Sequence, residues 1–316
     1  MMYKNSVKLL FSNFSLVWKT LLYNLIVFVL VGGLSYLAAL PVFELLIEYG
    51  LGSMIQNMFA DFASSLNLIL FVQDCGAILT SFSEIILDNF SSIAFNIILF
   101  LFIIFVFGKF VSGVLKATQS EVLYSSMSSN MRVGLITSFV GNSKRILLLQ
   151  LTQFIVTFPI DIVITFAVLM CFRLFTIGGI LSVLTPFIIM LVAMILVSLR
   201  ISLFCAWMPL VAVKDMGIFA SLKENFKLVV RRLPKIFANS LGVVFTTIVV
   251  NGFALLFTIG VGLFITIPLC SVLLRTYQMS AFYGCYGMRY YVDYGTIVEP
   301  KRMEATERLS RTKYRI

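Results

Sequence analysis

Long apolar runs with few charged residues dominate the chain. An α-helix needs roughly 20 residues to cross about 30 Å of hydrocarbon, and each run is close to that length. The runs lack the strict alternation of transmembrane β-strands, which argues against a barrel. Four of the runs predict one membrane span each, at about residues 20–42, 91–113, 146–171 and 180–205.

A fifth apolar stretch predicts two further spans. Between Lys235 and Arg275 roughly forty consecutive residues carry no charge, which is too long for a single crossing. Gly260 and Gly262 lie inside this stretch and favour a turn there. The pattern therefore predicts an all-α fold: a polytopic transmembrane helical bundle of about six spans in three hairpins, with interfacial amphipathic helices.

Basic residues are distributed unevenly along the chain. None lies between Lys19 and Lys109, whereas that stretch contains six acidic residues. Lys and Arg are enriched in cytoplasmic loops of membrane proteins, so the basic clusters before and after the spans are predicted to be cytoplasmic. This places both termini in the cytoplasm and residues 45–90 on the outer side of a plasma (inner) membrane. The acidic residues of the stretch are Glu44, Glu48, Asp61, Asp74, Glu84 and Asp88.

These signals predict one transmembrane domain over residues 1–316. Its segments, in chain order, are a cytoplasmic amphipathic segment (1–19), a first hairpin (20–113) with an outer amphipathic connection (45–90), a cytoplasmic segment (114–145), a second hairpin (146–215) that turns near Gly178 and Gly179, a cytoplasmic amphipathic helix (216–235), a third hairpin (236–292) and a cytoplasmic tail (293–316).

The outer connection shows helical spacing of apolar residues in two places. We predict two amphipathic helices there, which either lie on the outer membrane surface or pack over the ends of the bundle. The residues that carry the pattern are Ile55, Met58, Phe59, Phe62 and Leu66 in the first helix, and Ile78, Phe82, Ile85 and Ile86 in the second.

Composition supports the membrane class and argues against enzymes. Hydrophobic residues make up 60% of the chain, charged residues 12%, and the mean hydropathy is +1.03, so an aqueous surface cannot be built. The chain contains no His, which excludes Ser-His-Asp triads and His-ligated metal sites. Its five cysteines form no CxxC pair and are predicted to be packing residues. We therefore expect no catalytic residue, no metal site and no cofactor.

Residues 206–244 carry a family resemblance. The matching positions are Pro209, Ser221, Leu222, Phe226, Lys227, Leu228, Val229, Arg231 and Arg232. This stretch resembles a recurring element of an uncharacterised bacterial family, named after the membrane domain attached to some glycerophosphoryl diester phosphodiesterases. The resemblance implies a polytopic bundle of the bacterial plasma membrane. The phosphodiesterase chemistry belongs to a separate soluble domain, so the resemblance implies no catalytic residue here.

Asp161 is the one acid inside a predicted span. An ionised carboxylate in hydrocarbon costs at least about 2.5–3.5 kcal/mol, so Asp161 needs a partner or a proton. One interpretation is an interhelical pair with Arg200 or Arg275. The other is a coupling-ion or substrate site, in which Pro159 loosens the helix and frees backbone carbonyls.

Three basic residues occupy equivalent places near the ends of predicted inward-going spans. Lys109, Arg200 and Arg275 could each extend toward the membrane interface, or they could converge into a basic pocket for a phospholipid headgroup or an anionic solute. The sequence leaves both interpretations open.

The segment 216–235 carries a basic stripe. Lys223, Lys227, Arg231 and Lys235 follow one another at intervals of four residues, beside an apolar face. Such a helix suits anionic lipid headgroups on the cytoplasmic side, and docking onto a protein partner is the rival interpretation. The net charge of +10 is spread over clusters beside the spans, which favours lipid over nucleic acid.

Two function classes remain. We favour a non-enzymatic lipid-interacting or accessory membrane subunit. The alternative is a transporter or channel subunit with an intramembrane site around Asp161.

Overall fold

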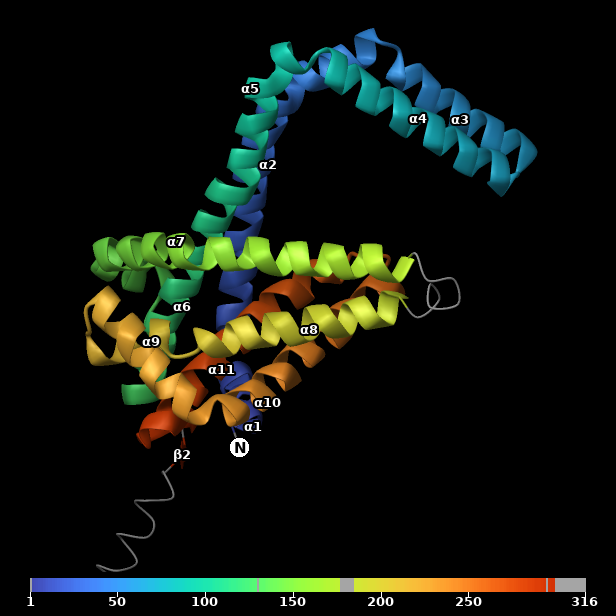
Figure 1. The fold of residues 1–316 in the computed structure, drawn as a ribbon. Coiled ribbons are helices and arrows are strands. Elements are labelled where there is room, and N and C mark those ends of the chain that lie inside the picture. Colours follow the sequence, from blue (N-terminus) through green and yellow to red (C-terminus); the bar gives the residue numbers. More distant parts are fainter. Residues whose placement is uncertain (1, 130, 177–184, 294, 299–316) are drawn as a thin grey trace, which may run out of the picture. The chain divides into compact units, whose positions relative to one another are not determined.

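The computed structural model describes residues 2–129, 131–176, 185–293 and 295–298 (Figure 1). Helices dominate this part of the chain. Their bounds are α1 (Met2–Ser12), α2 (Ser15–Glu48), α3 (Leu51–Ser65), α4 (Leu68–Asp88), α5 (Phe90–Leu101), the π-helix η1 (Phe102–Gly108), α6 (Lys109–Ser129), α7 (Leu135–Thr176), α8 (Thr185–Leu203), α9 (Trp207–Lys214), α10 (Ile218–Thr258) and α11 (Leu263–Tyr286). The predicted turn at Gly178 and Gly179, the start of the fourth predicted span (180–184) and most of the tail (293–316) lie outside the described residues.

Seven of the helical stretches are long and apolar enough to cross a membrane, which fits a multi-pass membrane protein. The prediction of about six spans counted six of these stretches. The seventh, Leu70–Asp88, was predicted to be part of the outer connection. The predicted break at Gly260 and Gly262 is confirmed, because α10 ends at Thr258 and α11 begins at Leu263. Gly260 adopts φ +87°, a left-handed conformation that glycine tolerates well.

A short two-stranded sheet follows α11 and was not predicted. Strand β1 (Tyr290–Asp293) pairs antiparallel with β2 (Thr296–Val298). Strand β1 also packs against α1, and Asn5 Nδ2 donates a hydrogen bond to the Tyr290 hydroxyl at 2.7 Å. The sheet therefore ties the last described residues to the first helix.

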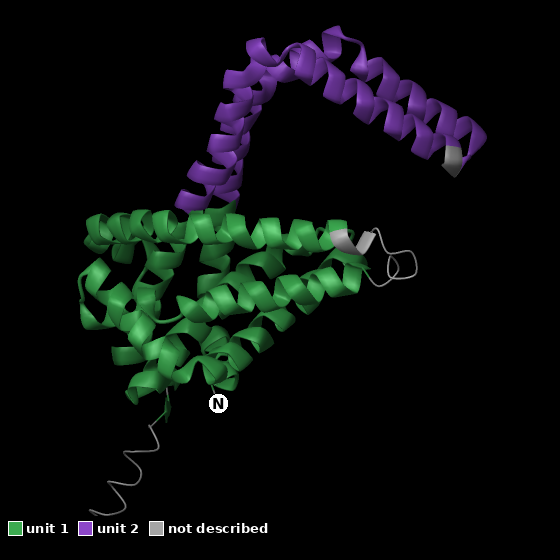
Figure 2. Cartoon of the chain, in the orientation of Figure 1, with its two compact units in different colours: residues 1–24, 112–316 green, residues 25–111 purple. Residues whose placement is uncertain are grey.

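The chain divides into two compact units, coloured separately in Figure 2. Unit 1 contains residues 1–24 and 112–316, and unit 2 contains residues 25–111. Helices α2 and α6 each contribute residues to both units.

Unit 1 is built around α11. From Val272 to Tyr283 nearly every residue of this helix is buried, and α1, α9 and α10 pack against it. Helix α8 packs against both α7 and α10, so consecutive long helices are neighbours (Figure 1). The largest fully buried side chains include Trp207, Tyr277 and Phe282. Unit 1 is therefore a helical bundle with a well-formed interior.

Hydrogen bonds between small polar side chains also hold unit 1 together. Ser202 and Ser240 lie 2.7 Å apart through their hydroxyl oxygens, which links α8 to α10. The Tyr277 hydroxyl donates to the Ile236 carbonyl at 2.7 Å, which links α11 to α10. Gln119 donates to Thr20 at 2.7 Å, which links α6 to α2. Such contacts allow helices to associate where hydrocarbon removes the hydrophobic driving force.

Three of the long helices begin in the same way. Helix α2 follows α1 after a break at Asn13 and Phe14, while α7 and α10 each contain one residue with non-helical dihedrals near their start, at Asn142 and Arg232. The predicted helix 216–235 is therefore the first part of α10, and Arg232 and Pro234 separate it from the apolar part. The same arrangement, a short helix followed by a break and then by a long apolar helix, thus occurs three times in the fold.

Unit 2 has a thin interior. Its helices α3 and α4 form a hairpin in which the rings of Phe62 and Phe71 lie 4.7 Å apart. A small apolar cluster of Leu46, Leu51 and Ile85 joins this hairpin to α2. The two amphipathic helices predicted for the outer connection are thus present as α3 and α4.

Candidate ion-pair, buried arginine and basic surface sites

Asp161 of α7 is paired with Arg200 of α8. Arg200 Nε contacts Asp161 Oδ1, and Arg200 Nη2 donates to Oδ2 at 3.0 Å, so the guanidinium grips the carboxylate through both oxygens. The two side chains are 27% and 30% exposed. Such a two-point contact is stronger and more directional than a single charged hydrogen bond. The sequence analysis offered either Arg200 or Arg275 as the partner of Asp161, and in the structure the partner is Arg200.

Helix α7 is continuous through Pro159. In the interpretation of Asp161 as an ion or substrate site, Pro159 was expected to loosen the helix and free backbone carbonyls. The only residue of α7 with non-helical dihedrals is instead Asn142, with φ −125° and ψ 19°. Pro159 is therefore accommodated within α7 without non-helical dihedrals, and the interpretation of Asp161 as an ion or substrate site stays a prediction. Proline removes one N–H donor, and here the flanking residues keep helical dihedrals.

Arg275 lies inside unit 1. Only 6% of this residue is exposed, and it sits in the middle of the most buried helix of the bundle. Its Nη1 donates to Gln278 Oε1 and approaches the Met208 sulfur at 3.3 Å. Its Nε has no hydrogen-bond partner in the described structure. Arg275 therefore neither pairs with Asp161 nor extends to an exposed surface.

Lys109 belongs to unit 2, at the C-terminal end of the π-helix η1, and is half-buried. Arg200 and Arg275 both belong to unit 1, where Arg200 lies near enough for its positive charge to act on Arg275. Two of the three basic residues that the sequence grouped are thus neighbours within one bundle.

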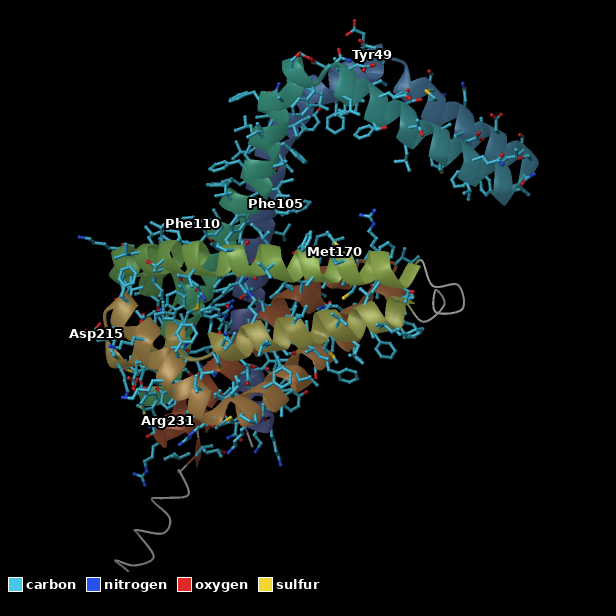
Figure 3. All side chains as sticks on the ribbon, in the orientation of Figure 1. Tyr49, Phe105, Phe110, Met170, Asp215 and Arg231 are labelled. Atoms are coloured by element: carbon cyan, nitrogen blue, oxygen red, sulfur yellow. The ribbon has the colours of Figure 1, made fainter. Side chains whose placement is uncertain are left out.

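The first part of α10 has three distinct faces. Ser221, Asn225 and Val229 point into unit 1 and are fully buried. Opposite to them, the basic residues Lys223, Lys227 and Arg231 are all exposed, as is Lys235 beyond the kink. Figure 3 labels Arg231 on this helix and Asp215 on the connection before it. The predicted basic stripe is therefore an accessible surface.

An apolar stripe runs beside the basic one. Phe219 is 75% exposed, Phe226 38% and Val230 70%. At about 100° per residue these three side chains lie within roughly 40° of one another on the helix, next to Lys223 and Lys227. The exposed half of the helix thus combines an apolar strip and a cationic strip. We call these six residues, Phe219, Lys223, Phe226, Lys227, Val230 and Arg231, the α10 surface.

Asn225 and Trp207 fix this helix to the bundle, and sequence reasoning missed both. Asn225 Oδ1 accepts a hydrogen bond from the Ala206 backbone N–H at 3.0 Å, and its Nδ2 donates to the Leu203 carbonyl at 2.7 Å. These backbone groups lie where α8 ends and α9 begins, so a single amide satisfies both sides of the break. The Trp207 indole donates to the Ile218 carbonyl at 3.2 Å. The sequence signal that could have indicated the role of Asn225 is its position as an amide within a run of apolar and basic residues.

Further contacts hold the same end of the bundle. Arg145 Nη1 lies 2.7 Å from Asp215 Oδ1, and Lys214 Nζ lies 3.4 Å above the ring of Tyr286. The Tyr286 hydroxyl also donates to Glu224 on α10 at 3.3 Å. The α10 surface is therefore presented by a helix that is anchored from several neighbouring elements.

Together these features define a class: a multi-pass helical membrane protein with an ion pair between two long apolar helices, a buried arginine and an exposed basic and apolar surface. The chain matches no family model, no curated protein and no solved structure. The resemblance of residues 206–244 to the phosphodiesterase-associated membrane family therefore stays a prediction.

Proposed function

We propose that the protein is a non-enzymatic, lipid-interacting membrane subunit, and that the α10 surface binds anionic lipid headgroups. The observation that carries this proposal is the exposure of apolar and basic strips side by side on a helix whose third face is anchored. Apolar side chains of such a helix enter the boundary between headgroups and acyl chains, while Lys and Arg contact phosphates. Each basic residue near an anionic surface contributes on the order of 1 kcal/mol.

The proposal includes a topology of six spans. In this arrangement the hairpin α3–α4 lies on the outer side and both termini are cytoplasmic. Helix α3 has 15 residues, too few to cross a membrane, and α4 packs against it, so we place the two helices together outside the bilayer. An even number of spans also keeps the basic clusters near Lys8 and Arg289 on one side, as the cytoplasmic bias of Lys and Arg favours.

The contacts of Asp161 favour this proposal over the alternative of a transporter or channel subunit. Asp161 is engaged by Arg200, and α7 is not interrupted at Pro159. A carboxylate held by two contacts from a guanidinium serves first as a link between α7 and α8. We therefore do not pursue an ion-coupling role for Asp161.

Lipid binding is tested on the full-length protein in neutral detergent. Native mass spectrometry counts bound phosphatidylglycerol and phosphatidylcholine on the wild type and on a variant with Lys223→Gln, Lys227→Gln, Arg231→Gln and Lys235→Gln. We expect the wild type to retain more phosphatidylglycerol than phosphatidylcholine, and the variant to lose that preference. The control Arg132→Gln with Lys144→Gln removes exposed basic residues outside the α10 surface and should keep it. An unchanged preference in the fourfold variant would leave docking of a protein as the better account of this surface.

Topology is tested by labelling cysteines in intact cells with a membrane-impermeant thiol reagent. The native Cys75 on α4 should react. In a Cys75→Ser background, Ser64→Cys on α3 should react as well, while Ala220→Cys on α10 should react only after permeabilisation. All three positions are at least partly exposed in the structure, so the side of the membrane decides the outcome. Labelling of Ala220→Cys in intact cells would overturn the orientation.

A further inference from the structure

The most unusual group in unit 1 is the guanidinium of Arg275. It is 6% exposed, and it lies on α11 about 18 Å from the first residue of that helix, Leu263, at 1.5 Å per residue. The helix has 24 residues, so Arg275 is near its midpoint. A charged side chain at that position is far from both ends of the helix.

This charge lacks a negative partner among the described residues. The Asp161 carboxylate, which neutralises Arg200, is already engaged. The neighbours of Arg275 are the neutral amide oxygen of Gln278 and the thioether sulfur of Met208, and a thioether is a weak acceptor. Its buried Nε donates to nothing.

A buried arginine has few ways to relieve the free-energy cost of an unpaired charge. Burying an ionised group without a partner is costly, and most ionisable residues respond by becoming neutral. The guanidinium does not deprotonate under ordinary conditions, so this response is closed to Arg275. A counter-ion from outside the protein is the remaining way to balance the charge.

Donors from two helices meet at Met208. Arg275 Nη1 of α11 lies 3.3 Å from its sulfur, and the Ser120 hydroxyl of α6 lies 3.9 Å from the same atom. Ser120, Met208, Arg275 and Gln278 are all more than nine-tenths buried. We call these four residues the Arg275 cluster. It is rich in donors, and the acceptor that they share is weak and sits on a flexible side chain.

We propose that the Arg275 cluster binds a phosphate group, which takes the place of the Met208 sulfur beside the guanidinium. Phosphate oxygens are strong acceptors, and arginine recognises them through two parallel hydrogen bonds. The side-chain amide of Gln278 supplies a further donor, and the Ser120 hydroxyl, which donates to the Lys116 carbonyl at 3.2 Å, can rotate toward the phosphate instead. The phosphate belongs either to a lipid headgroup or to a free anion. This inference does not depend on the α10 surface, because it concerns a different and buried set of residues.

The first test measures the thermal unfolding of lipid-depleted wild-type protein in neutral detergent. Inorganic phosphate, phosphatidylglycerol and phosphatidylcholine are added separately, with sodium chloride at matched ionic strength as the reference. At a concentration on the order of 100 times Kd, a bound ligand should raise Tm by roughly 5 °C. A rise with inorganic phosphate identifies a free anion, and a rise with phosphatidylglycerol alone identifies a lipid headgroup. No rise with any of the three would overturn the proposal.

The second test assigns the response to the cluster. Arg275→Gln should remove the rise in Tm or weaken binding at least about tenfold, the scale of one lost charged hydrogen bond. The matched control Arg132→Gln, which alters an exposed arginine, should respond like the wild type. A response that survives Arg275→Gln would refute the assignment.

The third test does not depend on whether Arg275→Gln folds. Gln278→Glu is nearly isosteric and places a carboxylate next to Arg275, so it supplies the missing negative charge from within the protein. We expect this variant to have a higher Tm than the wild type without added anion and no response to phosphate. A Gln278→Glu variant that still responds as the wild type does would contradict the proposal. The fourfold variant of the basic stripe should keep the wild-type response, so the two lipid-related proposals fail separately.

Discussion

Unit 1 and unit 2 contain helices of comparable hydropathy but use their polar residues differently. Of the 19 polar or charged residues that are buried in the described structure, Ser35 belongs to unit 2 and the other 18 belong to unit 1. In α11 of unit 1, 56% of the most apolar window is buried, whereas in α4 of unit 2 none of it is. Hydropathy therefore identifies the membrane class, and buried polar side chains identify where helices pack.

The difference has a physical cause. Lipid is as apolar as Leu or Phe, so exposed apolar side chains of α2 and α5, the unit 2 helices that we propose to be in the bilayer, gain little by packing against one another. Polar side chains cannot be satisfied by lipid, so they turn inward and pair across helices, as Ser202 and Ser240 do. Charged residues are also distributed unevenly between the two units: unit 2 has six acidic residues and one basic residue, Lys109.

Matched truncations of phenylalanine should give the largest effect. Phe282 in unit 1 is 1% exposed, and Phe95 in unit 2 is 72% exposed. Phe282→Ala should lower the free energy of unfolding by about 3–5 kcal/mol, since it opens a cavity in the interior. Phe95→Ala should change it by about 0.5 kcal/mol or less. Thermal or denaturant unfolding in detergent measures both, and equal losses would show that unit 2 has an interior of its own.

The ion pair between α7 and α8 should give the next largest effect. Asp161→Asn leaves the Arg200 guanidinium without its carboxylate and should cost about 2–4 kcal/mol, somewhat less than a fully buried pair because both side chains are partly exposed. The double variant Asp161→Asn with Arg200→Gln leaves no unpaired charge, so it should recover most of the loss. Full stability of Asp161→Asn alone would contradict a structural role for the pair.

Two asparagines sharpen the comparison at a smaller scale. Asn225→Ala in unit 1 leaves the Ala206 N–H and the Leu203 carbonyl without partners in the interior, and should cost about 2 kcal/mol. Asn89→Ala in unit 2 removes a bond to the Ile85 carbonyl and a long, exposed bond from the Tyr49 hydroxyl at 3.4 Å, and should cost about 0.5–1 kcal/mol. The Tm of the two variants is compared. A larger decrease in Tm for Asn89→Ala would indicate that unit 2, and not unit 1, is the better-packed unit.

The sequence predicts the helical class well because span length and hydropathy are local properties. The run before Gly260 and the run after Gly262 appear as separate helices, as expected. The number of spans is less well determined, since α4 satisfies the same criteria of length and composition as the six helical stretches that were predicted to be spans. The small sheet at Tyr290 was missed because four residues with a short alternation carry little signal within a helical chain.

The candidate sites show the limit of sequence more clearly. That Asp161 needs a partner follows from the cost of a bare carboxylate, but the choice of Arg200 depends on how α7 and α8 pack. In the sequence, Arg275 and Arg200 both lie near the ends of predicted inward-going spans. The burial of Arg275 inside the bundle is visible only in the three-dimensional structure. Asn225 was missed because its role is to bridge backbone groups 19 and 22 residues earlier in the chain. Roles that depend on long-range packing are not visible in one sequence.

The position of α1 has a consequence for the order in which the protein assembles. The Met2 carbonyl accepts a hydrogen bond from Ser280, 278 residues later in the chain, and the Tyr3 hydroxyl lies 2.8 Å from that of Thr246. Helix α1 is synthesised long before α10, α11 and β1, and all of unit 2 precedes these elements in the chain, so α1 forms its contacts only after most of the protein has been made. A chain whose synthesis stops before α11 therefore lacks the helix against which α1 packs. Such an incomplete chain exposes the face of α1 that carries Leu9 and Leu10, which the complete bundle buries, and exposed apolar surface of this kind makes unfinished chains prone to aggregation.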